Sequence, residues 1–139
     1  MFKKFLEVHL TNFKNQIHFI ENGEIRGQAA IVGLGLNGHV AFHEPHMPTD
    51  FSFGQVDLSP ESCKTLDIPQ GSQGYTHGLG NILAAERILL IVTGNHKKNI
   101  LQRTLAGDSS IPAGKLIKHQ DLTIITDIKK ADLERPAAE

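Results

Sequence analysis

The sequence is poor in cysteine, in long apolar runs and in net charge. Its one cysteine, Cys63, excludes a disulfide framework within the 139 residues and is typical of a protein from a reducing cytosol. Its 14 basic and 15 acidic residues give a formal net charge of −1, so the chain has no electrostatic footprint for nucleic acid. No apolar run approaches the ~20 residues that a membrane span requires.

The N-terminus and the length narrow the class of protein further. Residues 1–7 interleave lysines with apolar side chains and therefore lack the apolar core of a signal peptide. A chain of 139 residues has room for one domain with an adequate core. We therefore expect a soluble, cytoplasmic protein in which residues 1–139 form a single domain, with neither a membrane nor a nucleic acid as its partner.

Apolar strand patterns alternate with helical patterns along the chain. The predicted strands are 28–33, 55–58, 87–93 and 122–126. The predicted helices are an amphipathic one over 2–21, then 61–66, 77–85 with Thr76 as its cap, one with Lys97 in its first turn that runs to Ala106, and a short helix or turn over 112–119. Residues 71–74 are predicted to be mobile and turn-rich. This alternation predicts the α/β class, with an open parallel Rossmann-like sheet flanked by helices.

The most informative stretch is Gly-Leu-Gly-Leu-Asn-Gly-His-Val-Ala-Phe-His-Glu-Pro, residues 33–45, which follows an apolar strand. Its glycines permit a tight backbone turn, and Asn, His and Glu side chains follow at once. Because ligands bind at the carboxyl ends of strands in open α/β sheets, we expect this loop to form the functional site.

Two interpretations of this loop rank low. The glycines of residues 33–38 spell G-x-G-x-x-G, but Pro45 arrives too soon for the helix that a dinucleotide site opens at the third glycine. Zinc or iron would find four candidate ligands, imidazoles and a carboxylate, within eight residues: His39, His43, Glu44 and His46. No distant cysteine pair supports a metal site, and the flanking glycine and proline disfavour the helix that would align the histidines.

The third interpretation is acid–base chemistry without a metal. His39 titrates near neutrality and can carry a proton, with Glu44 and Asn37 as its neighbours. An isolated loop histidine more often caps a helix or bonds a backbone carbonyl. A glycine-rich loop at a strand end, beside a carboxylate, favours the catalytic interpretation.

The loop resembles the signature of the glucosamine-6-phosphate and galactosamine-6-phosphate deaminase/isomerase family, G-x-G-x-[DN]-G-H-x-x-[FL]-N-E-P. The resemblance continues through Thr-His-Gly-Leu-Gly at 76–80, Ile-Val-Thr-Gly-Asn-His-Lys at 91–97, and Ile-Pro-Ala at 111–113 with His119. It extends over residues 22–127 in the family's order. It matches only the second, C-terminal half of family members, which are much longer than this chain.

The resemblance implies the family's chemistry, in which an amino-sugar 6-phosphate ring opens, a proton moves between C2 and C1, and a ketose phosphate and ammonia leave. His39 would assist ring opening, Glu44 would hold the imidazolium and favour its charged form, and Asn37 would orient the histidine. Lys97 would contact the phosphate, and Gly35 and Gly38 would be further substrate-binding residues. The resemblance implies neither a metal nor an organic cofactor.

One residue departs from the usual sequence of the glucosamine branch, and two depart from the pattern of the family. Asn37 stands where the glucosamine branch carries Asp, which favours a galactosamine-type substrate. His43 stands where Asn is usual, and Gly114 stands where Ser follows Pro-Ala. His119 is expected to bond a loop and to take no part in catalysis.

The first half of family members carries a phosphate loop and the aspartate that shuttles the C1–C2 proton, and residues 1–21 match neither. Without a general base the isomerisation step has no agent. We therefore expect a truncated, incomplete enzyme whose partners are an amino-sugar phosphate and either further copies of the chain or a complementing N-terminal half. The alternatives are a non-catalytic remnant that binds sugar phosphates or a partner protein, and a hydrolase like the 6-phosphogluconolactonases, a sister family with a similar loop.

Overall fold

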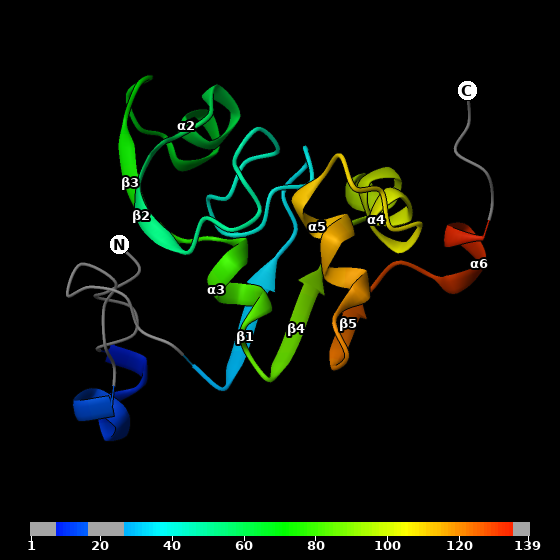
Figure 1. Cartoon of the computed structure of the whole chain (residues 1–139), viewed down its shortest axis with the longest axis horizontal. Coiled ribbons are helices and arrows are strands. Elements are labelled where there is room, and N and C mark those ends of the chain that lie inside the picture. Colours follow the sequence, from blue (N-terminus) through cyan, green and yellow to red (C-terminus); the bar gives the residue numbers. More distant parts are fainter. Residues whose placement is uncertain (1–7, 17–26, 135–139) are drawn as a thin grey trace.

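The computed structural model describes residues 8–16 and 27–134 (Figure 1). The strands are β1 (Ala29–Gly33), β2 (Phe53–Asp57), β3 (Gln73–His77), β4 (Arg87–Val92) and β5 (Leu122–Thr126). The α-helices are α2 (Pro60–Leu66), α3 (Leu79–Leu83), α4 (Lys98–Leu105), α5 (Pro112–Lys115) and α6 (Lys130–Leu133). Short 3-10 helices are η1 (Thr11–Gln16), η3 (Asn95–Lys97) and η4 (Leu116–Lys118). The described residues contain no helix with the length and apolarity needed to cross a membrane.

The main sheet is parallel and has the strand order β1–β4–β5. Its register aligns Ala30 with Ile88, and Ile88 with Leu122, so residues of one parity share one face across the three strands. Helices α3, α4 and α5 connect or follow these strands, which is the α/β arrangement predicted from the sequence. The parallel order also brings the carboxyl ends of β1 and β4 together. The glycine-rich loop of residues 33–45 follows β1 there, and Lys97 follows β4.

The core lies on one face of this sheet. Ile88, Leu90 and Val92 of β4 are fully buried. They pack with side chains from the helices, namely Leu79, Ile82, Ile100, Leu101, Ala113 and Leu116. On the other face Ile31, Ile91 and Ile125 are 69%, 39% and 52% exposed. The described helices therefore cover one face, whereas parallel sheets are usually covered on both.

Beside the sheet, β2 and β3 form an antiparallel pair that extends away from it with α2 (Figure 1). Two predictions fail here. Gln73 and Gly74 belong to β3 and not to a mobile turn, and α3 begins at Leu79 after the N-cap Gly78. Thr76 therefore lies in a strand. Its Oγ1 accepts the N–H of Phe42 at 3.1 Å, which ties the predicted functional loop to this antiparallel pair.

The helix predicted over 2–21 lies largely outside the described residues. Within them, η1 is a 3-10 helix, and Val8, Leu10 and Phe13 are 60%, 40% and 52% exposed. This part of the segment therefore does not bury an apolar face on the sheet.

Candidate functional site

The loop after β1 is held in a tight turn by its own backbone. Gly35 N–H donates to the carbonyl of His39 at 2.9 Å, and Gly38 N–H donates to that of Gly35 at 3.0 Å. Asn37 Oδ1 accepts the backbone N–H of His39 at 3.0 Å, as in an Asx turn. A Cβ at position 35 would overlap the His39 ring, so glycine is needed for the imidazole to lie against the backbone.

His39 faces Glu44 across this turn. His39 Nδ1 lies 3.8 Å from Glu44 Oε1, and the two side chains are 21% and 3% exposed. Nδ1 is buried and has no hydrogen-bond partner among the described residues. Asn37 Nδ2 donates to Glu44 Oε2 at 2.7 Å. The three residues predicted to act together do meet, but the Asn37 side chain holds the carboxylate and the backbone of His39, not its ring.

Burial lowers the pKa of His39 below its ordinary value of 6.5, because the imidazolium would lose its water of hydration. Glu44 opposes this shift, and the ammonium of Lys97 reinforces it. The net direction is opposite to the one that a neighbouring carboxylate alone would produce. At neutral pH the ring is therefore neutral and able to accept a proton.

Lys97 reaches the same place from the carboxyl end of β4. It is the last residue of η3 and the N-cap of α4, and its Nζ donates to the carbonyl of Leu34 at 2.6 Å. An ammonium has three N–H donors, so this contact leaves two for a ligand. The predicted helix is confirmed, but it begins at Lys98, so that Lys97 is its N-cap and does not lie in its first turn.

A cavity of about 490 Å³ joins these groups, a size typical of small-molecule sites. Its lining comes from three parts of the chain: the loop with Gly35, Asn37 and His39; α2 with Glu61, Ser62 and Thr65; and the η3 turn with His96 and Lys97. The sequence did not single out the α2 residues or His96. Ser59 and Pro60 predict where α2 begins. The position of α2 over the loop cannot be predicted in the same way, because it depends on how the segment with β2 and β3 folds back.

Gly38 lies outside this lining and packs the loop against α5. Its φ is 87°, a conformation that favours glycine. Its carbonyl accepts the N–H of Ala113 at 3.0 Å, and a Cβ there would collide with the Ile111 side chain. Gly35 lines the cavity, whereas Gly38, which was also expected to bind substrate, has a packing role.

His43 is a buried anchor and not a surface residue. It is fully buried, and its Nδ1 accepts the N–H of Leu79 at 3.1 Å, where α3 begins. Burial lowers its pKa. His119 bonds the carbonyl of Ala85 and the N–H of Asp121, in line with the structural role expected of it. Among residues 8–16 and 27–134, no three His, Cys, Asp or Glu side chains converge as metal ligands would.

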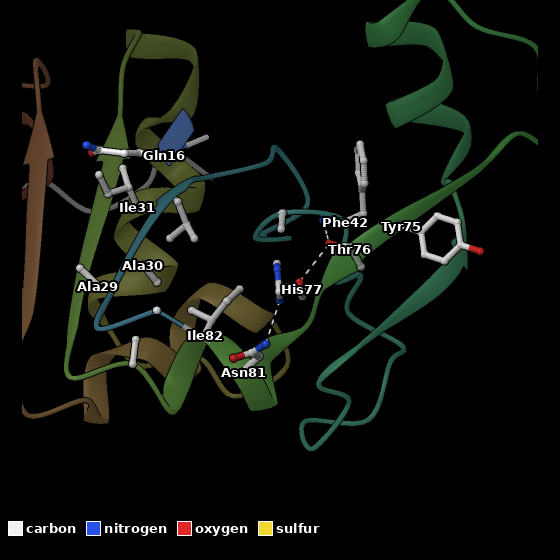
Figure 2. A pocket seen from close by; sticks show the side chains of 14 residues that line it. Gln16, Ala29, Ala30, Ile31, Phe42, Tyr75, Thr76, His77, Asn81 and Ile82 are labelled. Atoms are coloured by element: carbon white, nitrogen blue, oxygen red, sulfur yellow. Dashed lines mark hydrogen bonds between the residues drawn. The ribbon is translucent and has the colours of Figure 1, made fainter. Parts of the chain in front are cut away.

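A second cavity, of about 690 Å³, lies on the other side of Ala41 and Phe42, which line both cavities. Figure 2 shows residues 29–31 of β1 on one side of it and Thr76 and His77 of β3 on the other. His77 and Asn81 point toward each other, with His77 Nδ1 2.8 Å from Asn81 Nδ2. β1 ends the described sheet, so this cavity runs along its unpaired edge.

Comparison with known proteins identifies relatives of the chain. The glucosamine-6-phosphate deaminase of Streptococcus sanguinis is 30% identical over an alignment that covers 91% of this chain and 65% of that enzyme. A solved monomeric glucosamine-6-phosphate deaminase has a TM-score of 0.68 and 28% identity, over 76% of this chain and 47% of its own. The chain is a relative of the glucosamine-6-phosphate deaminases. It spans less than two thirds of the length of these relatives.

A wider likeness concerns the fold alone. The 6-phosphogluconolactonase of Trypanosoma cruzi superposes with a TM-score of 0.56 at 21% identity, over 73% of this chain and 38% of its own. No protein-family model matches the chain. The deaminase resemblance read from the loop is thus confirmed, and the sister hydrolases share the α/β fold.

Proposed function

We propose that the cavity around His39 binds an amino-sugar 6-phosphate, glucosamine-6-phosphate or galactosamine-6-phosphate, and that the chain supplies the ring-opening part of a deaminase/isomerase reaction. The observation that carries the proposal is the convergence of a partly buried proton carrier and an ammonium on one cavity. His39, backed by Glu44, lines it together with Lys97. The names of the relatives support the glucosamine epimer, and Asn37 at the aspartate position of the signature keeps the galactosamine epimer as a candidate.

Ring opening needs a group that takes a proton from the anomeric hydroxyl and a group that returns one to the ring oxygen. A neutral His39 can do both in turn, because it accepts a proton first and then donates it as an imidazolium. Glu44 stabilises the imidazolium once it forms. Asn37 holds the other carboxylate oxygen, so that Oε1 stays on the side of the imidazole.

Lys97 would bind the 6-phosphate through charge-assisted hydrogen bonds. The same ammonium lowers the pKa of His39. A bound phosphate neutralises it, so the pKa of His39 should rise when the substrate enters the cavity. Substrate binding and the affinity of the histidine for a proton are coupled in this way.

The later C1–C2 proton transfer requires a further base. Among the described residues that line the cavity, the only carboxylate is Glu61, which is exposed at its rim. We propose that this base comes from a complementing polypeptide. The chain by itself would then be weakly active or inactive in isomerisation. The chain would then bind the sugar phosphate without converting it.

The unpaired edge of β1 is where such a polypeptide would join. β1 pairs with β4 alone among the described strands, and Ala29–Val32 line the large cavity along its other side. Backbone groups at an open sheet edge are satisfied when another strand is added. A complementing polypeptide that adds a strand here would also bring its own side chains to the carboxyl end of β1, beside His39.

The first experiment titrates the purified chain with glucosamine-6-phosphate, galactosamine-6-phosphate and inorganic phosphate by calorimetry, and measures ammonia release in parallel. We expect saturable binding of one or both sugars and little ammonia. Lys97→Ala should weaken binding about tenfold or more, the loss expected for a charged hydrogen bond. The matched control Lys98→Ala removes the neighbouring ammonium and should leave the affinity unchanged.

The outcomes distinguish an active enzyme from a site that binds the sugar phosphate but lacks the base for isomerisation. Binding with steady ammonia release would contradict the missing base and assign that role to a residue in this chain. Binding without turnover supports the incomplete site. The proposal fails if neither sugar binds a chain that is folded by circular dichroism, or if Lys98→Ala weakens binding as much as Lys97→Ala.

A further inference from the structure

We infer that Ser62 is a positioning residue that restrains the Glu44 carboxylate and so limits how closely it approaches His39, through a directed pair of hydroxyl hydrogen bonds that starts at the N-cap of α2. The inference rests on the proposed function in that it concerns the same His39–Glu44 pair. Its test uses no sugar phosphate, so it stands or fails separately from substrate binding.

Ser62 and Asn37 each donate a hydrogen bond to one oxygen of the Glu44 carboxylate. It lies in the first turn of α2, is 6% exposed, and its Oγ donates to Glu44 Oε1 at 3.5 Å. This is the oxygen that lies 3.8 Å from His39 Nδ1. The other oxygen, Oε2, accepts from Asn37 Nδ2. Each carboxylate oxygen thus has one donor, at a short distance from the loop and at a long one from α2.

The direction of the Ser62 hydroxyl follows from its neighbour. Ser59 Oγ accepts the backbone N–H of Ser62 at 3.2 Å and donates its own proton to Ser62 Oγ at 3.0 Å. A hydroxyl has one proton to give. Because Ser62 receives the proton of Ser59, its own proton is free for Glu44, and an ionised carboxylate can only accept. The order Ser59 to Ser62 to Glu44 is therefore set at both ends.

The two contacts of Oε1 are both long, so this oxygen lies between competing donors. While His39 is neutral, Ser62 holds Oε1 back from the ring. When His39 gains a proton, its charge attracts Oε1 more strongly than a hydroxyl does. Ser62 thus keeps Glu44 available without tying it to a permanently charged imidazolium, which agrees with the lowered pKa of His39.

The test is an NMR titration of the His39 ring in the whole chain, with the signal assigned by its loss in His39→Gln. In Ser62→Ala, Oε1 loses its competing donor and moves toward the imidazole. The pKa of His39 should then rise by about 0.5 or more, as a closer opposite charge favours the charged form. Ser62→Thr keeps the hydroxyl and should restore the wild-type value, which a purely structural role of the side chain would not explain.

Two further variants make the test sharp. Thr65→Val removes another hydroxyl from the same helix and cavity, and should leave the pKa of His39 unchanged. Ser59→Gly keeps an acceptable N-cap but removes the donor that directs the Ser62 hydroxyl. In this variant the pKa of His39 should lie between its values in the wild type and in Ser62→Ala.

The inference is overturned if a folded Ser62→Ala leaves the pKa of His39 within about 0.1 of wild type, or if Thr65→Val moves it equally. Should Ser62→Ala not fold, an unchanged pKa in Ser59→Gly overturns it.

Discussion

His43 shows how one buried side chain makes stability depend on pH. Its pKa is lowered by burial, so the folded chain binds a proton at His43 only at a lower pH than the unfolded chain, whose histidines titrate near 6.5. Between these two pKa values the unfolded state binds more protons. The free energy of unfolding therefore falls as the pH drops below about 6.5, and the stability is fully present above it.

We predict that His43→Asn removes the part of the pH dependence that His43 contributes, whereas His39, whose pKa is also lowered by burial, retains its own. Asn offers a carbonyl oxygen to the N–H of Leu79, which His43 Nδ1 accepts in the wild type, but Asn cannot titrate. Urea unfolding at about pH 7.5 and pH 5 measures the loss on acidification. It should be smaller in the variant, by up to about 1.4 kcal/mol per pH unit over the range between the two pKa values. Equal losses in both proteins would assign the acid sensitivity to other groups.

The meeting of the three loop residues was predictable because it is local in sequence. Asn37, His39 and Glu44 lie within eight residues, and a tight turn brings them together whatever the rest of the chain does. Two aspects were not predictable. The direction in which the pKa of His39 shifts depends on burial by distant parts of the chain, and Ser62 reaches Glu44 only because α2 folds back over the loop.

An amide at position 37 is suited to this site, since an Asp there would place a second negative charge beside Glu44.

The helical elements depend on close backbone contacts that no side-chain pattern reveals. In α5, a Cβ at Gly114 would lie 2.8 Å from the carbonyl carbon of Asp108 and closer still to its oxygen. The serine that usually follows Pro-Ala in the family signature therefore does not fit here without a backbone shift. Gly33, at the end of β1, has no atom within 4 Å of its Cβ position and no positive φ.

These two glycines form a matched pair for a stability measurement. Gly114→Ala should lower the free energy of unfolding by about 2 kcal/mol or more, because the backbone of Asp108 must move. Gly33→Ala should change it by less than about 0.5 kcal/mol. Chemical denaturation of both variants tests the comparison. Similar values for the two would show that the segment around Asp108 adjusts at little cost.

The elements that could be predicted are those with a strong local pattern. The run Arg87–Val92 is almost wholly apolar and forms β4, and Ser59 followed by Pro60 begins α2 as expected. The strand β3 was missed because its sequence, Gln-Gly-Tyr-Thr-His, has neither an apolar run nor a clear alternation. It forms because β2 lies beside it and supplies the hydrogen bonds of an antiparallel ladder, a long-range pairing that a local pattern does not show.

At the scale of the whole molecule, the parallel sheet is the feature least complete by itself. One face is filled by the helices, and the other presents Ile31, Ile91 and Ile125 to the outside of the described structure. Among the described strands, β1 has no partner on its outer edge, and the chain spans less than two thirds of the length of the relatives compared above. These observations agree with a site that is complete in its ring-opening residues and lacks its later base.

Substitutions on the two faces test whether the second face is truly bare in the isolated chain. Leu90→Ala on the filled face should cost about 2–5 kcal/mol of unfolding free energy, since it leaves a cavity in the core. Ile125→Thr on the other face keeps a β-branched side chain and should cost less than about 0.5 kcal/mol. Light scattering on the same samples reports the oligomeric state. If Ile125→Thr costs as much as Leu90→Ala in a monomer, another part of the chain covers this face. If it does so while dissociating an oligomer, further copies of the chain cover it, and the complementing polypeptide proposed for the edge of β1 would have to join without displacing them.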